Sequence, residues 1–344
     1  MAKCCIIGAG VIGLSTARCI QDSHGDWQLT LVSDRFSPDT TSDISPGSWH
    51  PPSSAEPTEL KKLQRWSLQT WNKMLELRRE NPLKYGVGLQ SGYELFPIKQ
   101  AEEPWFSTCV LDYKRVTREE LAALGWSDFT HGAFFTTFFL EPSKYLPCLL
   151  TDFQLKGGKV VQKKVENLQD LSADFDIIIN CTGLGSKTLV NDDSVYPIRG
   201  QVCTVSAPAV KHFVRIPCES SESYYYYYIL HKQDTVTLGG TYQAGDCNTE
   251  IDPKDSMKIW EKCFKLVPEL RSAKIIKEEV GLRPGRDRVR LEMELMQLKG
   301  KVVPVVHNYG HAGIGVTLHW GCALEASQLA TEAVLQLFKN KSKL

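Results

Sequence analysis

Apolar positions in the first 34 residues follow the order strand, helix, strand. Lys3 to Ile7 are predicted to form a short strand, residues 13–21 mix small and apolar residues as a packed helix does, and residues 27–32 form a second predicted strand. The turn after the first strand has the spacing Gly-x-Gly-x-x-Gly. This order of elements predicts a βαβ unit with a dinucleotide site at its turn.

The glycines and one acidic residue of this unit have distinct parts in that prediction. Gly8 allows the tight turn, Gly10 lets the backbone approach a pyrophosphate, and Gly13 lets helix and strand pack closely. The helix N-terminus then presents N–H groups to the phosphates. Asp34 lies 21 residues after Gly13, where a carboxylate binds the ribose hydroxyls of an adenosine. A Rossmann turn without a nucleotide is the alternative.

The remaining periodicity indicates that related strands lie far along the chain. Strands are predicted at residues 159–162, 176–183 and 302–306. Helices are predicted at residues 59–79, 145–153, 255–270 and 321–339, with strands and loops at 86–137 and strongly alternating strands at 199–243. We therefore expect an α/β fold in which a discontinuous Rossmann-like domain is interlaced with an α+β domain built on a mixed sheet.

Composition and charge narrow the class of protein. A chain of 344 residues suggests two domains. Its 40 Lys and Arg residues balance its 40 Asp and Glu residues, so nothing indicates nucleic acid or an acidic membrane as a partner. No apolar run approaches the ~18 residues of a membrane span, and no secretory signal is visible. The 11 cysteines are therefore expected to be reduced and mostly buried.

Two segments carry candidate binding chemistry. Arg283 precedes Pro284, and a guanidinium fixed in this way can bind both oxygens of a carboxylate. A solvated basic stretch is the alternative, because Arg286 and Arg288 follow closely. Five consecutive tyrosines occupy residues 224–228. Alternate tyrosines share a face if this run is a strand, and a half-buried strand is the simpler interpretation.

Two further segments admit more than one interpretation. The loop at residues 36–43 is rich in hydroxyl side chains, which suit either phosphate contact or helix capping. His307, His311 and His319 suggest a metal, but their spacing fits no common site and no metal is expected. The glycines between these histidines indicate backbone packed against a flat ligand, before a helix whose N-terminus faces it.

Ser342-Lys343-Leu344 form a tripeptide that acts as a peroxisomal address at a C-terminus. Together with the dinucleotide turn, it predicts a flavoenzyme of the peroxisomal matrix. The import receptor is then an expected partner, in addition to a small-molecule substrate.

These segments together resemble the D-amino-acid oxidase family over nearly the whole chain. The resemblance adds FAD as the expected cofactor and oxygen as the expected acceptor. The motifs that carry it are Gly8-Ala9-Gly10-Val11-Ile12-Gly13-Leu14-Ser15, Ser33-Asp34-Arg35-Phe36, Thr40-Thr41-Ser42-Asp43, Asn180-Cys181-Thr182-Gly183, Arg199-Gly200-Gln201, Gly281-Leu282-Arg283-Pro284, and His307-Asn308-Tyr309-Gly310-His311 through His319-Trp320-Gly321.

The resemblance implies where FAD would lie. The pyrophosphate would lie at the glycine turn, the adenosine ribose on Asp34, the adenine on the backbone of Val165, and the flavin ring along residues 313–317. The cofactor-binding residues implied in this way are Gly8, Ala9, Gly10, Val11, Ile12, Gly13, Asp34, Arg35, Thr40, Thr41, Ser42, Gly47, Ser48, Val165, Gly183, Arg283, Ala312, Gly313, Ile314, Gly315, Val316 and Thr317.

The resemblance also implies the reaction. Arg283 would pair with the substrate α-carboxylate, Tyr228 would hydrogen-bond to it, and the Gly313 carbonyl would accept the amine. Tyr224 resembles a mobile tyrosine that covers the pocket. A hydride would pass from the substrate Cα to flavin N5, the imino acid would hydrolyse to a 2-oxo acid and ammonia, and oxygen would become hydrogen peroxide. No acid–base residue is required.

Substrate charge is predicted from residues outside the shared motifs. Arg215 resembles an arginine of the acidic-substrate branch and would pair with the side-chain carboxylate of D-aspartate or D-glutamate, a surface arginine being the alternative. Ser48 and His50 would make the pocket more polar, whereas Tyr242 occupies a position where that branch usually has another arginine. Acidic D-amino acids are therefore predicted. The alternatives are neutral D-amino acids, a nicotinamide dehydrogenase and a non-catalytic flavin-binding protein.

The predicted domains are interlaced along the chain. The FAD-binding domain is predicted to comprise residues 1–47, 143–190 and 287–344, and the substrate-binding domain residues 48–142 and 191–286. Both a monomer and a homo-oligomer are compatible with the sequence.

Overall fold

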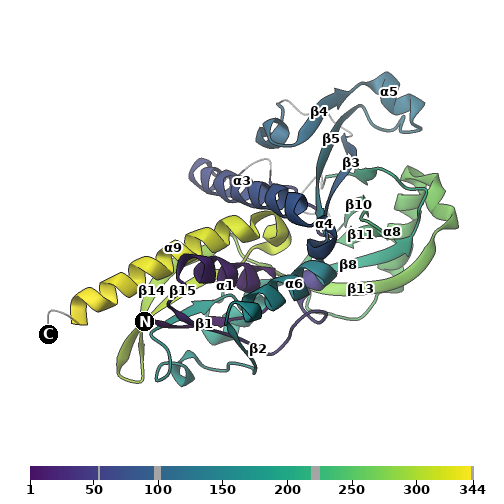
Figure 1. The fold of residues 1–344 in the computed structure, drawn as a ribbon. Coiled ribbons are helices and arrows are strands. Elements are labelled where there is room, and N and C mark those ends of the chain that lie inside the picture. Colours follow the sequence, from purple (N-terminus) through teal and green to yellow (C-terminus); the bar gives the residue numbers. More distant parts are fainter. Residues whose placement is uncertain (53–54, 97–101, 218–224, 342–344) are drawn as a thin grey trace.

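A computed structural model describes residues 1–52, 55–96, 102–217 and 225–341. The described chain forms two sheets, one of six strands and one of nine, with helices packed mainly on the smaller sheet (Figure 1). The two sheets exchange chain segments several times, so neither is made from one continuous stretch of sequence.

The six-stranded sheet has the order β14-β15-β7-β1-β2-β6. Neighbouring strands are parallel except at the β14–β15 hairpin. The strands are β1 (Lys3–Ile7), β2 (Gln28–Ser33), β6 (Lys159–Gln162), β7 (Ile177–Asn180), β14 (Arg290–Leu298) and β15 (Lys301–Tyr309). The predicted strands at residues 3–7 and 159–162 are confirmed with their bounds unchanged, and the strands near 27, 176 and 302 are confirmed with small shifts.

Strand β14 is an addition that the sequence pattern does not predict. It lies at the edge of the sheet, where Glu292 and Glu294 pair with Arg290 at 2.7 and 2.8 Å. In the sequence, the many charged residues of this exposed edge make it look like a solvated stretch without regular structure. The stretch after Pro284 is therefore partly a strand whose arginine has fixed carboxylate partners.

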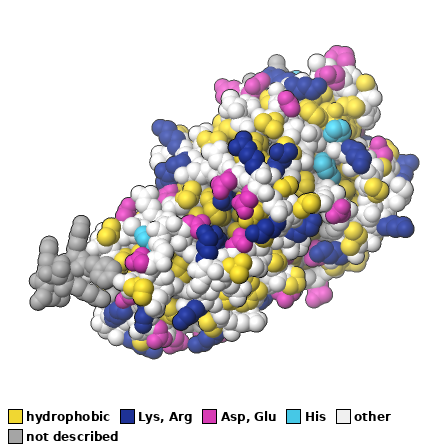
Figure 2. All heavy atoms as spheres, viewed as in Figure 1, with side chains coloured by type: hydrophobic (Ala, Val, Ile, Leu, Met, Phe, Trp, Pro, Cys, Tyr) yellow, Lys and Arg dark blue, Asp and Glu magenta, His cyan; other side chains and the backbone are white. Residues whose placement is uncertain are grey.

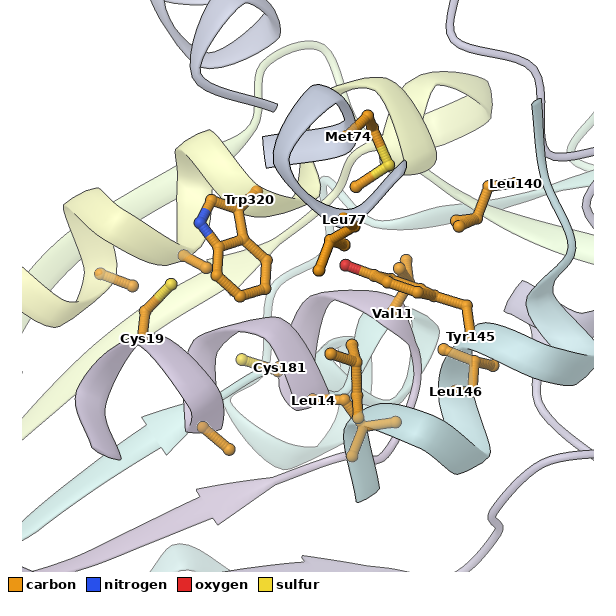
Figure 3. Packing of buried hydrophobic residues seen from close by; sticks show 14 of the residues in the cluster. Val11, Leu14, Cys19, Met74, Leu77, Leu140, Tyr145, Leu146, Cys181 and Trp320 are labelled. Carbon is orange, nitrogen blue, oxygen red and sulfur yellow. The ribbon is translucent and has the colours of Figure 1, made fainter. Parts of the chain in front are cut away.

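Four long helices cover the six-stranded sheet and one another. Helix α1 packs against α9, and α9 packs against α3 (Figure 1). These helices are α1 (Val11–Ser23), α3 (Pro57–Glu80), α6 (Pro142–Leu155) and α9 (Gly315–Lys341). Figure 3 shows Met74 and Leu77 of α3 facing Leu14 of α1 and Tyr145 of α6, so side chains from three helices share one core.

The terminal helix begins six residues earlier than predicted, at Gly315 instead of Gly321. Gly321 lies inside the helix, at the point where α3 crosses α9 closely. A Cβ at this position would lie 2.3 Å from the Trp66 Cα and carbonyl oxygen. The glycine therefore permits helix packing, and it does not mark a helix start.

The nine-stranded sheet is mixed, as expected. Its order is β12-β8-β11-β10-β9-β3-β5-β4, with β13 paired to β8, and among the described residues only the β3–β9 pair is parallel. The strands are β3 (Val87–Phe96), β4 (Leu111–Val116), β5 (His131–Leu140), β8 (Tyr196–Ser206), β9 (Phe213–Arg215), β10 (Tyr225–His231), β11 (Val236–Thr241), β12 (Gln243–Ala244) and β13 (Lys274–Gly285).

The remaining helical segments lie in the connections of both sheets. They are α2 (Thr41–Ile44), α4 (Pro82–Tyr85), α5 (Arg118–Ala123), α7 (Ser186–Leu189), α8 (Pro253–Leu266) and the 3-10 turns η1 (Trp105–Thr108), η2 (Leu168–Asp170), η3 (Gly183–Gly185), η4 (Pro268–Ser272) and η5 (Ala312–Ile314). The helix predicted at 255–270 is α8 followed by η4, divided at Pro268.

A buried ion pair attaches α8 to the nine-stranded sheet. The Arg199 guanidinium of β8 donates to Asp255 at 2.8 Å, and the two side chains are 1% and 5% exposed. Arg199 also donates to Gln201 and Gln243. In the Arg199-Gly200-Gln201 motif, the Arg199 side chain therefore has a structural role, which is to attach α8 to the sheet.

The described cysteines are free thiols, and most of them are buried. Burial raises the pKa of Cys181 to about 12, so this thiol is not a nucleophile at neutral pH. None of the described helices is long and apolar enough to cross a membrane. Acidic and basic side chains are intermixed over the face visible in Figure 2. The domain boundaries proposed from the sequence stay a prediction.

Candidate active site

The glycine turn after β1 is closed by backbone contacts that exclude any side chain. Gly8 has a φ of +105°, and a Cβ there would lie 2.5 Å from the Cys181 carbonyl oxygen. A Cβ on Gly13 would lie 1.8 Å from the Gly8 carbonyl oxygen. The turn is therefore restricted to glycine by sterics from both β7 and α1. This is the close approach that the dinucleotide prediction requires.

Two serine hydroxyls bind the N–H groups that flank Gly10. The Ser33 Oγ accepts from Ala9 N–H at 3.2 Å, and the Ser42 Oγ accepts from Val11 N–H at 3.0 Å. Gly10 itself is the N-cap of α1, and a Cβ there would meet the Ser42 hydroxyl at 3.2 Å. Ile12 follows in the first turn and packs against the core. The loop containing Ser42 thus lies directly on the helix N-terminus.

The hydroxyl-rich loop uses one of its threonines as a helix cap. The Thr40 hydroxyl donates to the Asp43 carboxylate at 2.6 Å, and the Thr40 N–H donates to it at 3.1 Å. Thr41 begins the short helix α2 and is exposed. Of the two interpretations of this loop, capping is the contact that the structure shows for Thr40, and Ser42 reaches the dinucleotide turn.

The carboxyl end of β2 carries the acidic residue of the dinucleotide prediction. Asp34 is 46% exposed and lies 3.6 Å from the Arg35 side chain. The Asp34 carbonyl accepts from Gln162 at the end of β6, and Lys163 N–H donates to the Ser33 carbonyl. The half-buried Val165 follows on the same connection. The predicted ribose and adenine positions therefore lie at neighbouring strand ends of one sheet edge.

The glycine-rich stretch before α9 lies against the nine-stranded sheet. Gly310 and Ala312 have positive φ values of 83° and 45°, so the chain turns sharply into η5 and then α9. A Cβ on Gly313 would lie 3.7 Å from the Arg283 side chain and 3.9 Å from the Tyr242 ring. Ile314, Gly315 and Val316 continue into the first turn of the helix. The structure thus places the predicted flavin-facing segment beside the predicted carboxylate-binding arginine.

The loop after residue 46 connects this helix with the nine-stranded sheet. Gly47 has a φ of +74°, and a Cβ there would lie 1.8 Å from the Leu140 carbonyl oxygen. His50 N–H donates to the Thr317 hydroxyl at 3.0 Å, and that hydroxyl donates back to the His50 carbonyl at 3.2 Å. These hydrogen bonds therefore join residues 47–50 to residue 317, which is distant in the sequence, on one side of the candidate site.

Ser48 is held from the sheet by an amide that the sequence interpretation did not include. The Gln90 side-chain amide of β3 donates to the Ser48 Oγ at 3.1 Å, and Ser48 forms an isolated bridge with Phe139. The Gln90 carbonyl oxygen is buried without a hydrogen-bond partner among the described residues. This side-chain oxygen belongs to the amide that holds Ser48, a residue predicted to bind the cofactor, and is suited to accept a hydrogen bond from a ligand.

Arg283 extends across β8 and toward the glycine-rich stretch. Its guanidinium donates to the Thr241 carbonyl at 3.1 Å and lies over the Tyr242 ring at 5.5 Å. A Cβ on Gly200 would lie 2.2 Å from the guanidinium, so Gly200 makes room for it. Arg286, in contrast, pairs with Asp192 at 3.0 Å. Arg283 is half-buried beside Gly313, whereas Arg286 and Arg290 have carboxylate partners elsewhere.

Tyr228 lies next to Arg283 on the face of the nine-stranded sheet. It is 4% exposed, and its ring covers Gly239, where a Cβ would lie 2.0 Å from the ring. Its hydroxyl has no hydrogen-bond partner among the described residues. Burial raises the pKa of Tyr228, while the Arg283 and Arg215 guanidiniums oppose that rise. The hydroxyl is therefore a neutral donor, buried and available to a ligand.

Arg215 is buried and belongs to the same face. It is 7% exposed, and its neighbours across the strands are Glu94 in β3 and Tyr228 in β10. The guanidinium donates to the Tyr226 hydroxyl and lies 5.2 Å from the Tyr226 ring centre. Its Nε has no hydrogen-bond partner among the described residues. The alternative of a surface arginine is therefore wrong.

The His50 imidazole and the Glu94 carboxylate are in close polar contact within this cluster. The His50 Nε2 lies 3.1 Å from the Glu94 Oε1, and the two side chains are 18% and 5% exposed. Burial lowers the pKa of His50, as does Arg215, while Glu94 opposes them. Burial opposes ionisation of Glu94, yet His50 and Arg215 hold its pKa below the ordinary value. The pair is therefore a neutral imidazole beside a carboxylate.

The tyrosine run alternates only in part as predicted. Tyr226 and Tyr228 have ring centres 5.8 Å apart and lie toward Arg215, whereas Tyr227 packs toward α8 with Lys262 over its ring. The pairing with β11 shifts register between Tyr225 and Tyr228. Tyr224, the predicted cover of the pocket, lies outside the described residues.

The three histidines near the C-terminal glycines are separate buried groups. Burial lowers the pKa of His311 to about 3, and that of His319 and His307 to about 4. His319 contacts the Tyr145 hydroxyl at 3.0 Å, and His307 contacts Glu294 at 3.2 Å. Within the described part of the chain, no three His, Cys, Asp or Glu residues are arranged to hold a metal ion.

Gly183 joins the two halves of the site. It has a φ of +56° at the end of β7, and a Cβ there would contact Pro284 at 3.7 Å. The site thus extends from the turn at Gly8, past Gly183, to Arg283 and Gly313. Its polar atoms without partners and its glycine-only contacts fit an extended dinucleotide with a flat ring.

Comparison with known proteins agrees with this geometry. The family model described as FAD dependent oxidoreductase matches residues 3–329. The chain is 40% identical over 335 residues to D-aspartate oxidase of Homo sapiens, covering 97% of this chain and 96% of the relative. It is 34% identical to D-amino-acid oxidase of Rubrobacter xylanophilus, covering 97% of each.

The fold is also similar to that of solved oxidases. Glycine oxidase from Geobacillus kaustophilus superposes with a TM-score of 0.78 at 16% identity, over 96% of this chain and 95% of that one. This similarity confirms the expected fold, a Rossmann-like domain interlaced with a mixed-sheet domain.

Proposed function

This chain belongs to the FAD-dependent oxidoreductases of the D-amino-acid and D-aspartate oxidase family, and from that premise we propose that its substrates are acidic D-amino acids. D-Aspartate and D-glutamate carry two carboxylates and one amine. The products would be the 2-oxo acid, ammonia and hydrogen peroxide. A preference for neutral D-amino acids is the other candidate.

One observation carries the acidic preference. Two guanidiniums lie near the buried Tyr228: Arg215 is its cross-strand neighbour, and Arg283 lies over Gly200 in the strand beside the one that Tyr228 covers. Arg283 lies beside the glycine-rich stretch, and Arg215 lies deeper, 7% exposed, with an Nε that has no partner among the described residues. One arginine would bind the α-carboxylate, and the other would bind the side-chain carboxylate.

The residues of the chain supply orientation. Arg283 and the Tyr228 hydroxyl would hold the α-carboxylate, and the Gly313 carbonyl would accept the amine. These contacts, together with the side-chain contact at Arg215, would fix the direction of the remaining Cα–H bond. FAD, when bound, accepts the two electrons and the hydrogen of that bond and passes the electrons to oxygen.

The neutral-substrate candidate is favoured by Tyr242. This residue is 39% exposed and its ring lies under Arg283, so it adds no second positive charge to the pocket. A pocket with Arg215 partly balanced by Glu94 would also admit an uncharged side chain. The choice between the candidates therefore depends on how strongly Arg215 attracts a carboxylate.

A peroxide-release panel tests the proposal. We expect purified FAD-loaded enzyme to oxidise D-aspartate and D-glutamate with a higher kcat/KM than D-alanine and D-proline. Arg215→Leu should lower kcat/KM for D-aspartate about 100-fold and change that for D-alanine by less than about fivefold. Arg288→Leu, at an exposed arginine, is the matched control. Equal losses on both substrates, or a neutral preference of the wild type, would reject acidic specificity.

We also propose a peroxisomal location, on the basis of Ser342-Lys343-Leu344, which lie outside the described residues. A fluorescent fusion that keeps this tripeptide at its C-terminus should accumulate in peroxisomes. The same fusion without the tripeptide should stay in the cytosol. Peroxisomal import of both fusions would contradict the proposal.

A further inference from the structure

Glu94 is a buried carboxylate beside the arginine proposed to bind an acidic substrate. It is 4% exposed and is the cross-strand neighbour of Arg215 in the parallel β3–β9 pair. A second anion at this place opposes the entry of a substrate carboxylate. A pocket that contains Glu94 and binds dicarboxylates therefore needs a group that offsets the extra negative charge.

His50 is the group in contact with Glu94. The Nε2–Oε1 separation is 3.1 Å, and the His50 ring packs edge-on against Phe106 with centres 5.0 Å apart. The backbone of His50 is fixed by both hydrogen bonds to the Thr317 hydroxyl. The imidazole is therefore held in place beside Glu94: the side chain as a whole is 18% exposed, whereas its Nε2 is buried and makes no hydrogen bond among the described residues.

The titratable groups that face this pair come from two further strands, β9 and β4. Glu94 of β3 and Arg215 of β9 act on the His50 imidazole, and Tyr113 of β4 faces Glu94 with a pKa that burial raises to about 12. Phe106, Phe135 and Thr317 are the uncharged contacts. Without substrate, the cluster thus contains one cation, Arg215, one anion, Glu94, and a neutral imidazole.

We propose that the His50–Glu94 pair is a specificity element that takes up one proton from solvent when a substrate with a second carboxylate binds beside Arg215. The inference rests on the proposed function. The entering carboxylate would leave two anions facing one guanidinium. Protonation of the imidazole restores neutrality, with Glu94 and the ligand carboxylate both near a cation.

Proton uptake by the His50–Glu94 pair also explains how a pocket with Tyr242 in place of a further arginine can accept a dicarboxylate. Imidazolium forms only when a second carboxylate is present. With an uncharged substrate side chain, Glu94 balances Arg215 and the imidazole stays neutral. His50 therefore supplies conditional positive charge, whereas an arginine would supply a permanent one.

The sign of the pH dependence follows from this linkage. Bound dicarboxylate raises the pKa of His50 above its value in the free protein. Affinity for the dicarboxylate is then full at low pH and falls as pH rises through the higher, ligand-bound pKa, by up to about tenfold per pH unit. A monocarboxylate held by Arg283 and Tyr228 does not change the charge beside His50. Its affinity should stay constant while the Tyr228 hydroxyl, whose pKa is raised, remains protonated.

The experiment compares malonate with acetate as unreactive probes of FAD-loaded enzyme. Dissociation constants are measured by calorimetry between about pH 6.5 and pH 8.5, in two buffers that differ in ionisation enthalpy, to count protons. We expect malonate affinity to fall with pH and to be accompanied by net proton uptake of up to about one proton. Acetate should show neither effect.

Two variants assign the proton to the pair. His50→Gln keeps a donor for Glu94, and it should weaken malonate binding at low pH and remove its pH dependence. Glu94→Gln removes the anion beside Arg215, and it should strengthen malonate binding at high pH by about tenfold or more. A merely structural role for these residues would weaken malonate and acetate alike. The flavin absorbance spectrum and the thermal midpoint serve as checks of folding.

The outcomes separate this inference from the proposed function. If D-aspartate is oxidised preferentially but malonate binds without proton uptake, the linkage is overturned and the acidic preference stands. If neither D-aspartate nor malonate is favoured over its single-carboxylate counterpart, acidic specificity itself is overturned. If both variants fail to fold, the number of protons that the wild-type protein takes up on binding malonate decides whether binding and protonation are linked.

Discussion

The two halves of the site are built from different materials. Around Gly8, Gly13 and Ser42, the contacts are made by backbone atoms and short hydroxyls of the first βαβ unit, its next loop and the chain just after β7. Around Arg283 and Arg215, they are made by long side chains from separate strands of the larger sheet. The first half is suited to a shape common to many nucleotides, whereas the second is the half in which we propose that substrate charge is recognised.

The difference determines how each half responds to substitution. A backbone-built site has no side chain to replace, so an added methyl group disrupts it by clash and the cofactor is lost. A side-chain-built site can lose a charge while the sheet beneath it stays folded. We expect changes in the first half to affect holoenzyme formation, and changes in the second to affect turnover and selectivity.

The largest expected effect is that of Gly13→Ala. The new Cβ would lie 1.8 Å from the Gly8 carbonyl oxygen, which must force α1 and β1 apart at a cost of about 3 kcal/mol or more. The purified variant should be colourless or unfolded, as judged by flavin absorbance and thermal denaturation. Gly25→Ala is the matched control, because nothing lies within 4 Å of a Cβ at that position. Normal FAD content in Gly13→Ala would contradict the backbone account of this half.

An intermediate effect is expected for Arg283→Lys, which keeps the charge and removes the planar fork. The lysine loses the two-pronged contact with a carboxylate, so kcat/KM for D-amino acids should fall at least about 100-fold. FAD should stay bound, which absorbance shows directly. Arg288→Lys supplies the control at an exposed position of the same stretch. Wild-type turnover in Arg283→Lys would show that the Arg283 guanidinium does not bind the substrate.

The smallest effect is expected for Ser42→Ala. Its hydroxyl accepts one hydrogen bond from Val11 N–H at the start of α1, and loss of such a cap costs about 1 kcal/mol. Thermal denaturation should show a small decrease in stability, with FAD retained and turnover little changed. Ser194→Ala is an exposed comparison. A complete loss of FAD in Ser42→Ala would mean that a side chain, and not the backbone, dominates this half.

The same contrast explains what the sequence can predict. The glycine turn, β1 and the residue Asp34 follow from local spacing within one supersecondary unit, and β6 follows from its own short apolar run, although its partner β2 lies far away in the sequence. Arg283, Tyr228 and Arg215 were identified through family resemblance, since no local pattern places them together. The helix start at Gly315 was misassigned because Gly321 reflects contact with Trp66, 255 residues earlier in the sequence.

The sequence interpretation does not include Glu94 and Gln90 for a related reason. Glu94 meets Arg215 only because β3 and β9 pair in parallel across 121 residues of chain. A polar residue inside the strand at 87–96, where apolar residues would be expected to face the core, was the available signal. Helix α5, also missed, was signalled by Thr117 and Glu120, which form a capping box.

The interleaving of β1 between β2 and β7 has a consequence for biosynthesis. As the nascent chain leaves the ribosome, the first strand is complete almost at once, but its neighbour at residues 177–180 is made much later, and the strand at 301–309 that completes this side comes near the end (Figure 1). Until then an apolar strand edge stays uncovered. The protein is therefore expected to mature after translation, and to depend on chaperones until its last helix has docked against its first.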